Sequence, residues 1–465
     1  MLTILDHSPS LCDRVSRRMV LRAGAATAFA SGAGFVGPAL SARGASTVAP
    51  KAKSCILLFL LGGPPQHSTW DPKPNAPAEV RGEFGPIPTT ADGVQICELL
   101  PQTARVMDHV ALLRAVSTGD NAHSSSGYQM LTGQPHIPLN AENVNPGPPN
   151  NFPTIGAVLQ HLHRGDTALP PSVRLPHQIF NTDLSVWPGQ DSGWLGHAAD
   201  PWLFNCEPAS ANFDVPQFRL QADVGLGRLN QRQSLLEQME HGLRDIDRGP
   251  SNATYHLQRE QALTLLGAPR ARQACDLNRE PPTVRDRYGR DQFGQSVLLA
   301  RRLVDAGVNF VQVNWFRGPD EPSNAPCWDS HAKEADRLKN VLMPSFDTAY
   351  SALITDLVQT GKIDETLVVV MAEFGRTPRF NGAGGRDHWG HVFSLAVAGG
   401  GIRGGVVHGG SDAQGGYPAD GKVSAADVTA TIFDRLGYHP DTELRDPLSR
   451  PLPISRGEPI SAILA

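Results

Sequence analysis

The strongest constraint on the fold is an uninterrupted apolar run at residues 367–372, in which three valines stand side by side. Such a run predicts a strand buried on both faces, as in a parallel sheet. It ends at Glu373 and opens into a Gly- and Arg-rich loop that carries Arg386, Asp387, His388 and His391. Open α/β sheets form their sites just beyond the carboxyl ends of their strands. We therefore expect a functional site in this loop.

Similar apolar runs recur along the chain and alternate with amphipathic segments. Strands are expected at residues 54–61, 109–116, 308–315, 393–397 and 406–408. Helices are expected at residues 154–161, 227–247, 253–266, 290–306, 333–360 and 425–436. This alternation predicts an α/β fold, a doubly wound and mostly parallel sheet sandwiched by helices. Residues 134–280 read as an insertion, irregular up to about residue 225.

The first residues carry the pattern of an export signal. Arg17 and Arg18 precede a weakly hydrophobic, alanine- and glycine-rich stretch at residues 23–40. This predicts a twin-arginine signal peptide at residues 1–44, with an ordinary amphipathic helix as the alternative. We expect export to the periplasm or the extracellular space, and an α/β domain at residues 50–465. No other run reaches the ~18 apolar residues of a membrane span, so no stable span is expected.

Composition narrows the partners and the cofactor. The net charge of −5 comes without a basic block, which argues against nucleic acid as a partner. The six cysteines form no CxxC pair, and removal of the signal would leave an odd number. A full disulfide framework and cysteine-ligated zinc are therefore not expected.

Carboxylates and imidazoles gather in four loops, each after a predicted strand: His67 and Asp71; His123 and Ser124; Asp329 and His331; and Glu373 with Asp387, His388 and His391. Such donors without thiols suit zinc, manganese or iron, with calcium as a further candidate. A divalent metal held by several loops would polarise an ester oxygen and activate a nucleophile.

Each group also has a structural alternative. Asp329 and Ser330 suit the cap of the following helix, and residues 124–126 suit helix capping. Asp71 before Pro72 suits a turn, Asn121 reads as an ordinary turn residue, and Asp387-His388 suits a loop hydrogen bond.

Several motifs resemble the domain-of-unknown-function 1501 family: GGPPQHSTWDPKP (62–74), HSSSGYQMLTG (123–133), EPPTVRDRYGR (280–290), WDSH (328–331) and EFGRTPRFNGAGGRDHW (373–389). The members of that family are exported proteins similar to the alkaline phosphatase and sulfatase superfamily. The resemblance implies an α/β/α sandwich that hydrolyses phosphate or sulfate esters with a divalent metal (zinc, calcium or manganese). It also implies an anionic ester substrate, with sulfated polysaccharide as a candidate.

Carried over by position, the resemblance places His123 at the superfamily's nucleophile position, with Ser124 beside it, so that Ser124 or His123 would be nucleophile or base. Asp329, His331 and His388 match metal ligands, and Arg376 or Arg386 would counter anionic charge. The chain departs from the pattern at three points. Its loop lacks the sulfatase C/S-x-P-x-R motif, Phe374 stands where a ligand histidine is expected, and Gly62-Gly63 lacks the first-strand acid. His67 and Asp71 are the nearest substitutes for that acid. The expected function is an exported metal-dependent hydrolase of sulfate or phosphate esters; the alternative is a non-catalytic binding or assembly protein on the same fold.

Overall fold

The computed structural model describes residues 51–163, 169–181, 183–211, 213, 227–228, 231, 234–235, 269–315 and 327–465. The predicted signal peptide and the predicted helix at 253–266 lie outside these residues. So does most of the predicted helix at 227–247.

A nine-stranded sheet forms the centre of the fold, in the order β12-β4-β11-β8-β1-β7-β5-β6, with β15 also paired to β4. The strands are β1 Ser54–Phe59, β4 Val110–Ser117, β5 Ser172–Leu175, β6 Trp202–Leu203, β7 Phe310–Asn314, β8 Thr366–Met371, β11 Phe393–Ala398, β12 Val407–His408 and β15 Val423–Ser424. Only β11 runs antiparallel to its neighbours β4 and β8; the other pairs are parallel. The predicted mostly parallel α/β sheet is confirmed.

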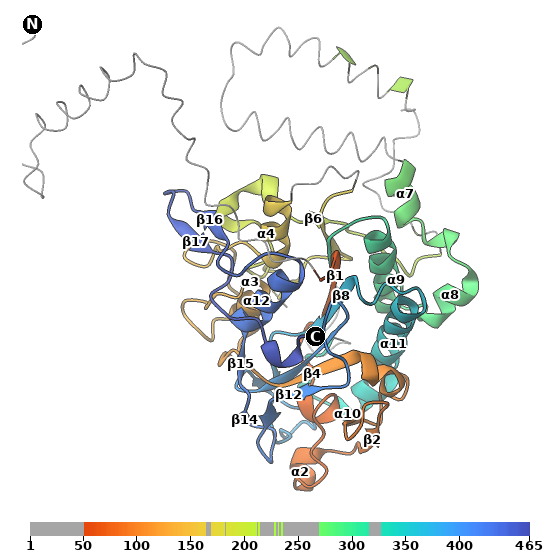
Figure 1. Cartoon of the computed structure of the whole chain (residues 1–465). Helices are drawn as coiled ribbons and strands as arrows, with labels where there is room; N and C mark the ends of the chain where they lie inside the picture. Colours follow the sequence, from red (N-terminus) through yellow and green to blue (C-terminus); the bar gives the residue numbers. More distant parts are fainter. Residues whose placement is uncertain are drawn as a thin grey trace, which may run out of the picture. The chain divides into compact units, whose positions relative to one another are not determined.

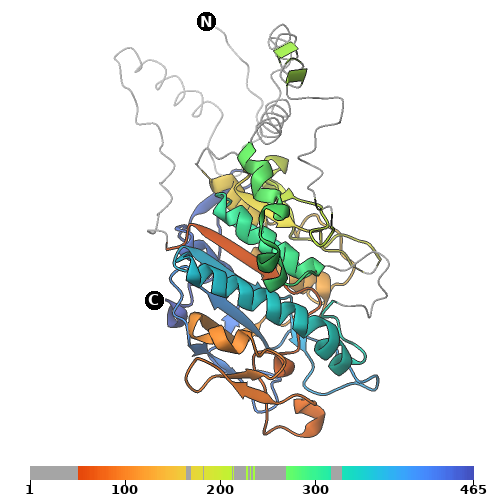
Figure 2. The same cartoon turned by 90° about the vertical axis from the view of Figure 1, so that its right-hand side faces the viewer.

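Helices cover both faces of the sheet (Figure 1). α9 (Gln292–Asp305) and α11 (Met343–Gln359) lie side by side on one face, as Figure 2 also shows. α3 (His123–Thr132), α4 (Ile155–Leu162) and α12 (Ala425–Arg435) lie on the other. The central strands β1 and β8 are buried along their whole length, which explains why their sequences are continuously apolar.

The helix predicted at 333–360 is present but interrupted. α10 (Glu334–Arg337) passes into a π-helical turn, η7 (Leu338–Leu342), before α11 begins at Met343. Pro344 lacks the amide hydrogen that a regular helix would bond at this point, and a π-turn is one way to accommodate that loss.

The segment after residue 134 is more regular than its sequence suggests, because β5 and β6 extend the central sheet. Short elements complete the chain: α2 Ala78–Arg81, β2 Pro86–Pro88, β3 Gln95–Cys97, α7 Pro269–Cys275, α8 Pro282–Arg287, β9 Gly375–Arg376, β10 His388–Trp389, β13 Gly410–Ser411, β14 Pro418–Asp420, β16 Glu443–Arg445 and β17 Pro451–Pro453.

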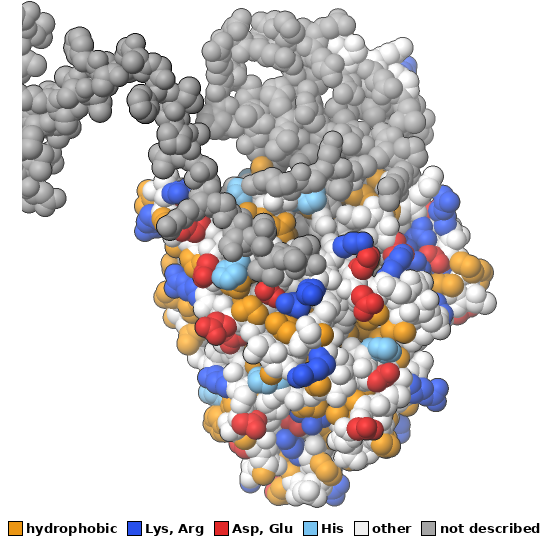
Figure 3. Space-filling view, viewed as in Figure 1, with side chains coloured by type: hydrophobic (Ala, Val, Ile, Leu, Met, Phe, Trp, Pro, Cys, Tyr) orange, Lys and Arg blue, Asp and Glu red, His pale blue; other side chains and the backbone are white. Residues whose placement is uncertain are grey.

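No helix among the described residues has both the length and the apolarity needed to cross a membrane. On the face shown in Figure 3, acidic and basic side chains are interspersed rather than gathered by sign.

Candidate metal centre

A cluster of imidazoles and carboxylates lies at one edge of the sheet. Glu373 follows the carboxyl end of β8, and His388 lies on β10, just before β11 enters the sheet from the same edge. His123 is the first residue of α3, which follows β4, and Asp329 and His331 precede α10. Residues from four separate stretches of sequence therefore meet beyond the strand ends, where open α/β sheets place their sites.

Each of the three histidines is fixed through its Nδ1 atom. His123 Nδ1 lies 2.7 Å from Glu373 Oε1, and His331 Nδ1 lies 2.9 Å from Asp387 Oδ1. His388 Nδ1 lies 2.9 Å from the main-chain oxygen of Asn121. These partners only accept hydrogen bonds, so each Nδ1 carries a proton, and Nε2 is the nitrogen that has the lone pair when the ring is neutral. This arrangement is typical of metal-binding histidines.

The three Nε2 atoms face the carboxylate of Asp329. His331 Nε2 and His388 Nε2 each lie 3.1 Å from Asp329 Oδ1, and His123 Nε2 lies 3.3 Å from Oδ2. His331 Nε2 and His388 Nε2 are 2.8 Å apart. Ligand atoms about 2.1 Å from one cation lie roughly 3.0–3.4 Å from each other. The separations among His331 Nε2, His388 Nε2 and Asp329 Oδ1 are close to that range, whereas His123 lies against the other oxygen of Asp329.

Electrostatics also favour a cation at this point. Burial alone would lower the pKa of His123, but the charges of Asp329 and Glu373 outweigh it and raise that pKa to about 9. Burial and the charge of His123 lower the pKa of His388 to about 3. Although burial opposes ionisation of Asp329, His123 and Arg376 hold its pKa far below the usual range. The cluster therefore contains an ionised carboxylate that attracts positive charge.

Apolar rings form the inner wall of the cluster. The Phe374 ring stacks on His388, with centroids 4.5 Å apart, and lies 4.9 Å from the His123 ring. Trp187 lies 5.6 Å from His123 on another side. The outer rim is polar and open to solvent, since the side chains of Glu142 and Asp387 are 40% and 57% exposed. Phe374 thus supports the imidazoles rather than binding a ligand itself.

The donor set fits a divalent transition metal. Among the described residues, two groups of three side chains have ligand atoms close enough together to hold a metal ion. They are Asp329, His331 and His388, and His123, Glu142 and His388. Glu373 Oε2 is buried and forms no hydrogen bond within the described chain, while His123 Nε2 lies 3.3 Å from Asp329 Oδ2. Buried polar atoms are nearly always satisfied, so Glu373 Oε2 is open to a further partner. Nitrogen-rich donors suit zinc or manganese better than calcium, which prefers oxygen.

The two predicted arginines are fully buried and bind protein atoms. Arg376 binds Asp329 and several main-chain oxygens. Arg386 binds Glu334, at 3.0 Å, and the main-chain oxygens of Thr377 and Val80. Both guanidinium groups are 0% exposed, so neither faces a substrate in this conformation.

Three predicted ligands lie apart from the cluster. His67 Nε2 lies 2.8 Å from the main-chain oxygen of Gln414, and Asp71 binds Lys73 and Ser411. His391 packs against Trp389 and Tyr417. None of the three belongs to a potential metal-binding group found among the described residues.

The serines of α3 are engaged elsewhere. Ser124 Oγ donates to Asn181, 3.2 Å away, and is fully buried. Ser125 Oγ donates to Asp120 and Ser126 Oγ to the main-chain oxygen of Glu373. Helix capping does not explain them, because the α3 N-cap is Ala122. Asp329 is no cap either, since α10 has Lys333 at that position.

Sequence reasoning missed two residues at the cluster. Glu142 Oε1 accepts a hydrogen bond from the His123 main-chain nitrogen and lies 3.8 Å from His388 Nδ1. Asn121, interpreted from its sequence as a turn residue, holds His388 through its main-chain oxygen. Residue type carries no signal for a main-chain acceptor, and Glu142 lies in a loop without periodicity.

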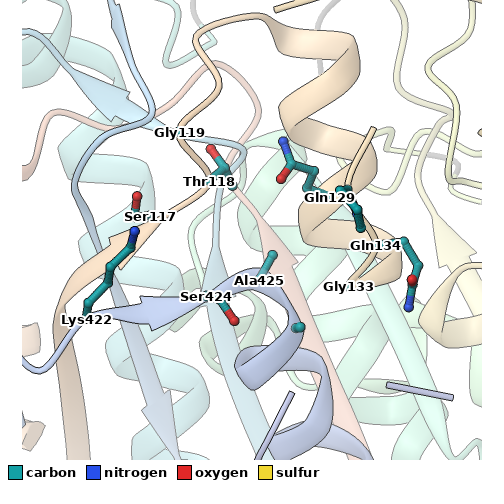
Figure 4. A pocket seen from close by; sticks show the side chains of 11 residues that line it. Ser117, Thr118, Gly119, Gln129, Gly133, Gln134, Lys422, Ser424 and Ala425 are labelled. Atoms are coloured by element: carbon teal, nitrogen blue, oxygen red, sulfur yellow. The ribbon is translucent and has the colours of Figure 1, made fainter. Parts of the chain in front are cut away.

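The hollow in Figure 4 is separate from this cluster. It has a volume of about 310 Å³ and lies between the end of β4, the flank of α3 and the start of α12. Its lining includes Ser117, Gln129, Gln134 and Lys422 and shares no residue with the cluster. The cluster is the better candidate site, because converging donors and not volume determine metal chemistry.

Comparison with known proteins gives a family and a set of remote structural likenesses. The family model described as "Protein of unknown function (DUF1501)" matches residues 52–464. Among curated proteins, none matches the chain in sequence.

Similar solved structures include a sulfatase, PsFucS1 from Pseudoalteromonas sp. (13% identity, 90% of this chain and 72% of that one, TM-score 0.37). Another is a phosphonate monoester hydrolase of Agrobacterium radiobacter (14% identity, 85% of this chain and 75% of that one, TM-score 0.39). A third is a protein in the alkaline phosphatase superfamily from Vibrio parahaemolyticus (12% identity, 85% of this chain and 68% of that one, TM-score 0.39). Likeness at this level does not extend to activity.

Proposed function

We propose that this chain, which belongs to the DUF1501 family of proteins of unknown function, catalyses the metal-dependent hydrolysis of phosphate or sulfate esters. Its own site supports this activity. The observation that carries the proposal is the convergence of three imidazole Nε2 atoms on the Asp329 carboxylate. Each imidazole is held from behind by an oxygen, which fixes the orientation of its ring.

Asp329, His331 and His388 would hold the cation, with His123 Nε2 beside the other oxygen of Asp329, and zinc or manganese suits this donor set. Glu373 and Asp387, both predicted as ligands from the sequence, would instead orient His123 and His331. When bound, the metal supplies Lewis-acid polarisation of an ester oxygen and lowers the pKa of a water molecule. Asp387 and Glu142 stand at the exposed rim, where a carboxylate can accept the proton of an attacking water.

Water is proposed as the nucleophile. The Ser124 hydroxyl is fully buried and bonded to Asn181, so it does not face the converging Nε2 atoms. His123 has its Nε2 directed toward Asp329, which suits a ligand better than the nucleophile implied by the sequence resemblance. The two buried arginines leave the metal as the main source of positive charge for an anionic ester.

The test combines metal content with turnover. The exported protein is expected to contain a divalent metal by elemental analysis and to hydrolyse 4-nitrophenyl phosphate or 4-nitrophenyl sulfate. His388→Ala is expected to lose the metal and at least 100-fold in turnover, because its imidazole belongs to both potential ligand groups. His391→Ala is the matched control, since His391 packs against Trp389 outside the cluster. A folded protein that binds no divalent metal would refute the proposal.

A non-catalytic binding protein is the second candidate. It is favoured by one observation, that the serines next to His123 are bonded to protein atoms and not directed at the cluster. A protein that retains its metal but turns over neither ester would support this reading. Sulfated polysaccharide as a substrate remains a prediction from the family resemblance.

Export by the twin-arginine route is also part of the proposal. It rests on Arg17, Arg18 and the weakly hydrophobic stretch after them. Replacing both arginines by lysine is expected to retain the protein in the cytoplasm, measured by cell fractionation. Unchanged export of this variant would contradict it.

A further inference from the structure

The end of β1 lies against the cluster but contributes only main-chain atoms. Gly62 donates its N–H to Glu373 Oε1, 2.8 Å away. A Cβ on Gly62 would lie 2.2 Å from the Asp329 nitrogen, and a Cβ on Gly63 would lie 2.5 Å from the Phe374 ring. The turn is therefore packed too closely to carry side chains. A carboxylate has no room at this strand end.

Arg376 fills the space beside this turn. Its Nε donates to the main-chain oxygen of Gly63 (3.0 Å) and its Nη1 to that of Arg386 (2.9 Å). Its Nη2 binds the Gly62 oxygen and lies 2.6 Å from Asp329 Oδ1. Because these acceptors surround a fully buried guanidinium, the Arg376 side chain is held in one position.

Asp329 therefore contacts both the Arg376 guanidinium and the three imidazoles. One side of its carboxylate faces the guanidinium, and both its oxygens also lie within 3.3 Å of imidazole Nε2 atoms. Among the buried groups, Asp329 and Glu373 contribute −2 and Arg376 contributes +1, which leaves −1 with the imidazoles neutral, the state in which their Nε2 atoms can bind a metal. One divalent cation makes the centre +1, whereas a second would make it +3 in a poorly solvated place.

We infer that Arg376 is a permanent internal cation that excludes a second metal, so that the centre binds a single divalent ion at Asp329, His331 and His388. This rests on the proposed metal-dependent function and goes beyond it, because it assigns the stoichiometry and gives Arg376 a positioning role. The guanidinium holds Asp329 in place without touching the substrate.

The first experiment counts metal ions in the wild-type chain. Metal-free protein is dialysed against zinc or manganese in separate samples, and bound metal per chain is measured by elemental analysis. One ion per chain is expected, with loss of that ion in His388→Ala. Two ions per chain, both lost in Asp329→Asn, would overturn the inference but leave the proposed function intact. No bound ion in a folded protein would refute the proposed function itself.

A second measurement uses Arg376→Gln. In this variant the main-chain oxygens of Gly62, Gly63 and Arg386 and one oxygen of Asp329 lose their cationic partner. Manganese content is expected to rise above one per chain, and a folded variant that stays at one would overturn the inference. Arg435→Gln is the matched control, because Arg435 is also a buried arginine but pairs with Asp434 on α12. Its metal content is expected to stay at one.

Discussion

Adding a single methyl group at Gly62 is expected to abolish metal binding while the sheet persists. In Gly62→Ala the new Cβ would lie 2.2 Å from the Asp329 nitrogen and 2.6 Å from the Trp328 carbonyl carbon. Both are main-chain atoms, so no side-chain rotation relieves the contact. Residue 62 also has φ +111°, a conformation that side chains rarely adopt.

The size of the effect follows from these contacts. Non-bonded atoms settle near ~3.5 Å, so the main chain at residues 328–329 must retreat by roughly 1 Å. Metal sites tolerate about 0.2 Å, and a displacement of about 1 Å can cost on the order of 100-fold in activity. Overpacking and the left-handed conformation together are expected to lower the free energy of unfolding by about 2–5 kcal/mol.

The assay compares Gly62→Ala with Gly361→Ala. Gly361 has a similar need for positive φ, +69°, but a Cβ there would meet nothing within 4 Å. The control is expected to lose only about 1–2 kcal/mol of unfolding free energy, with unchanged metal affinity. Urea denaturation gives the stabilities, and competition with a chelator gives the affinities. Wild-type metal affinity in a folded Gly62→Ala protein would refute the reasoning.

Three further predictions test neighbouring groups. Glu373→Gln is expected to weaken metal binding about 10–100-fold in chelator competition, because Glu373 orients His123; unchanged affinity would exclude that role. His67→Gln is expected to make the free energy of unfolding less sensitive to acid. Burial, with the charge of Arg386, lowers the pKa of His67 to about 3. The unfolded chain therefore binds a proton below pH ~6.5 that the folded chain refuses, and unfolding free energy falls by about 1.4 kcal/mol per pH unit. Denaturation at pH 7 and pH 5 should show about 2 kcal/mol less loss in the variant, and equal losses would contradict the assignment. Glu334→Ala leaves the buried Arg386 charge without its carboxylate and should cost about 3–5 kcal/mol of unfolding free energy without changing metal content. Unchanged stability would show that the main-chain oxygens satisfy Arg386 alone.

The sheet could be predicted from the sequence because its central strands are buried on both faces. β1 and β8 are continuously apolar, and that signal does not depend on the rest of the fold. β5 and β6 were not predicted, since they are short and lie in a segment rich in proline, asparagine and glycine. Their strand conformation depends on the pairing of β5 with β7 and of β6 with β5, which a local pattern does not contain.

The edge of the sheet that holds the cluster was also predictable, but the roles of its members were not. An acid next to a histidine suits a ligand and the partner of a ligand equally well. Glu373 and Asp387 lie behind His123 and His331, which only the Nδ1 contacts reveal. His391 comes from the same loop as His388, and His67 and Asp71 come from the loop after β1, yet their side chains turn toward Trp389, Gln414 and Lys73.

The cluster has consequences for the stability of the whole edge. The residues that hold the three imidazoles come from far apart in sequence, as in the His123–Glu373 pair, which is separated by 250 residues. The unfolded chain has no such site, so a cation that binds only the folded chain stabilises it by mass action. At about 1,000 times the dissociation constant this amounts to roughly 4 kcal/mol. Arg376 supplies part of the same charge compensation permanently, because its guanidinium neutralises one side of Asp329 whether or not metal is bound. Loss of the proposed metal would therefore leave Asp329 with one cationic partner, whereas Glu373 would keep its contacts with His123 and Gly62.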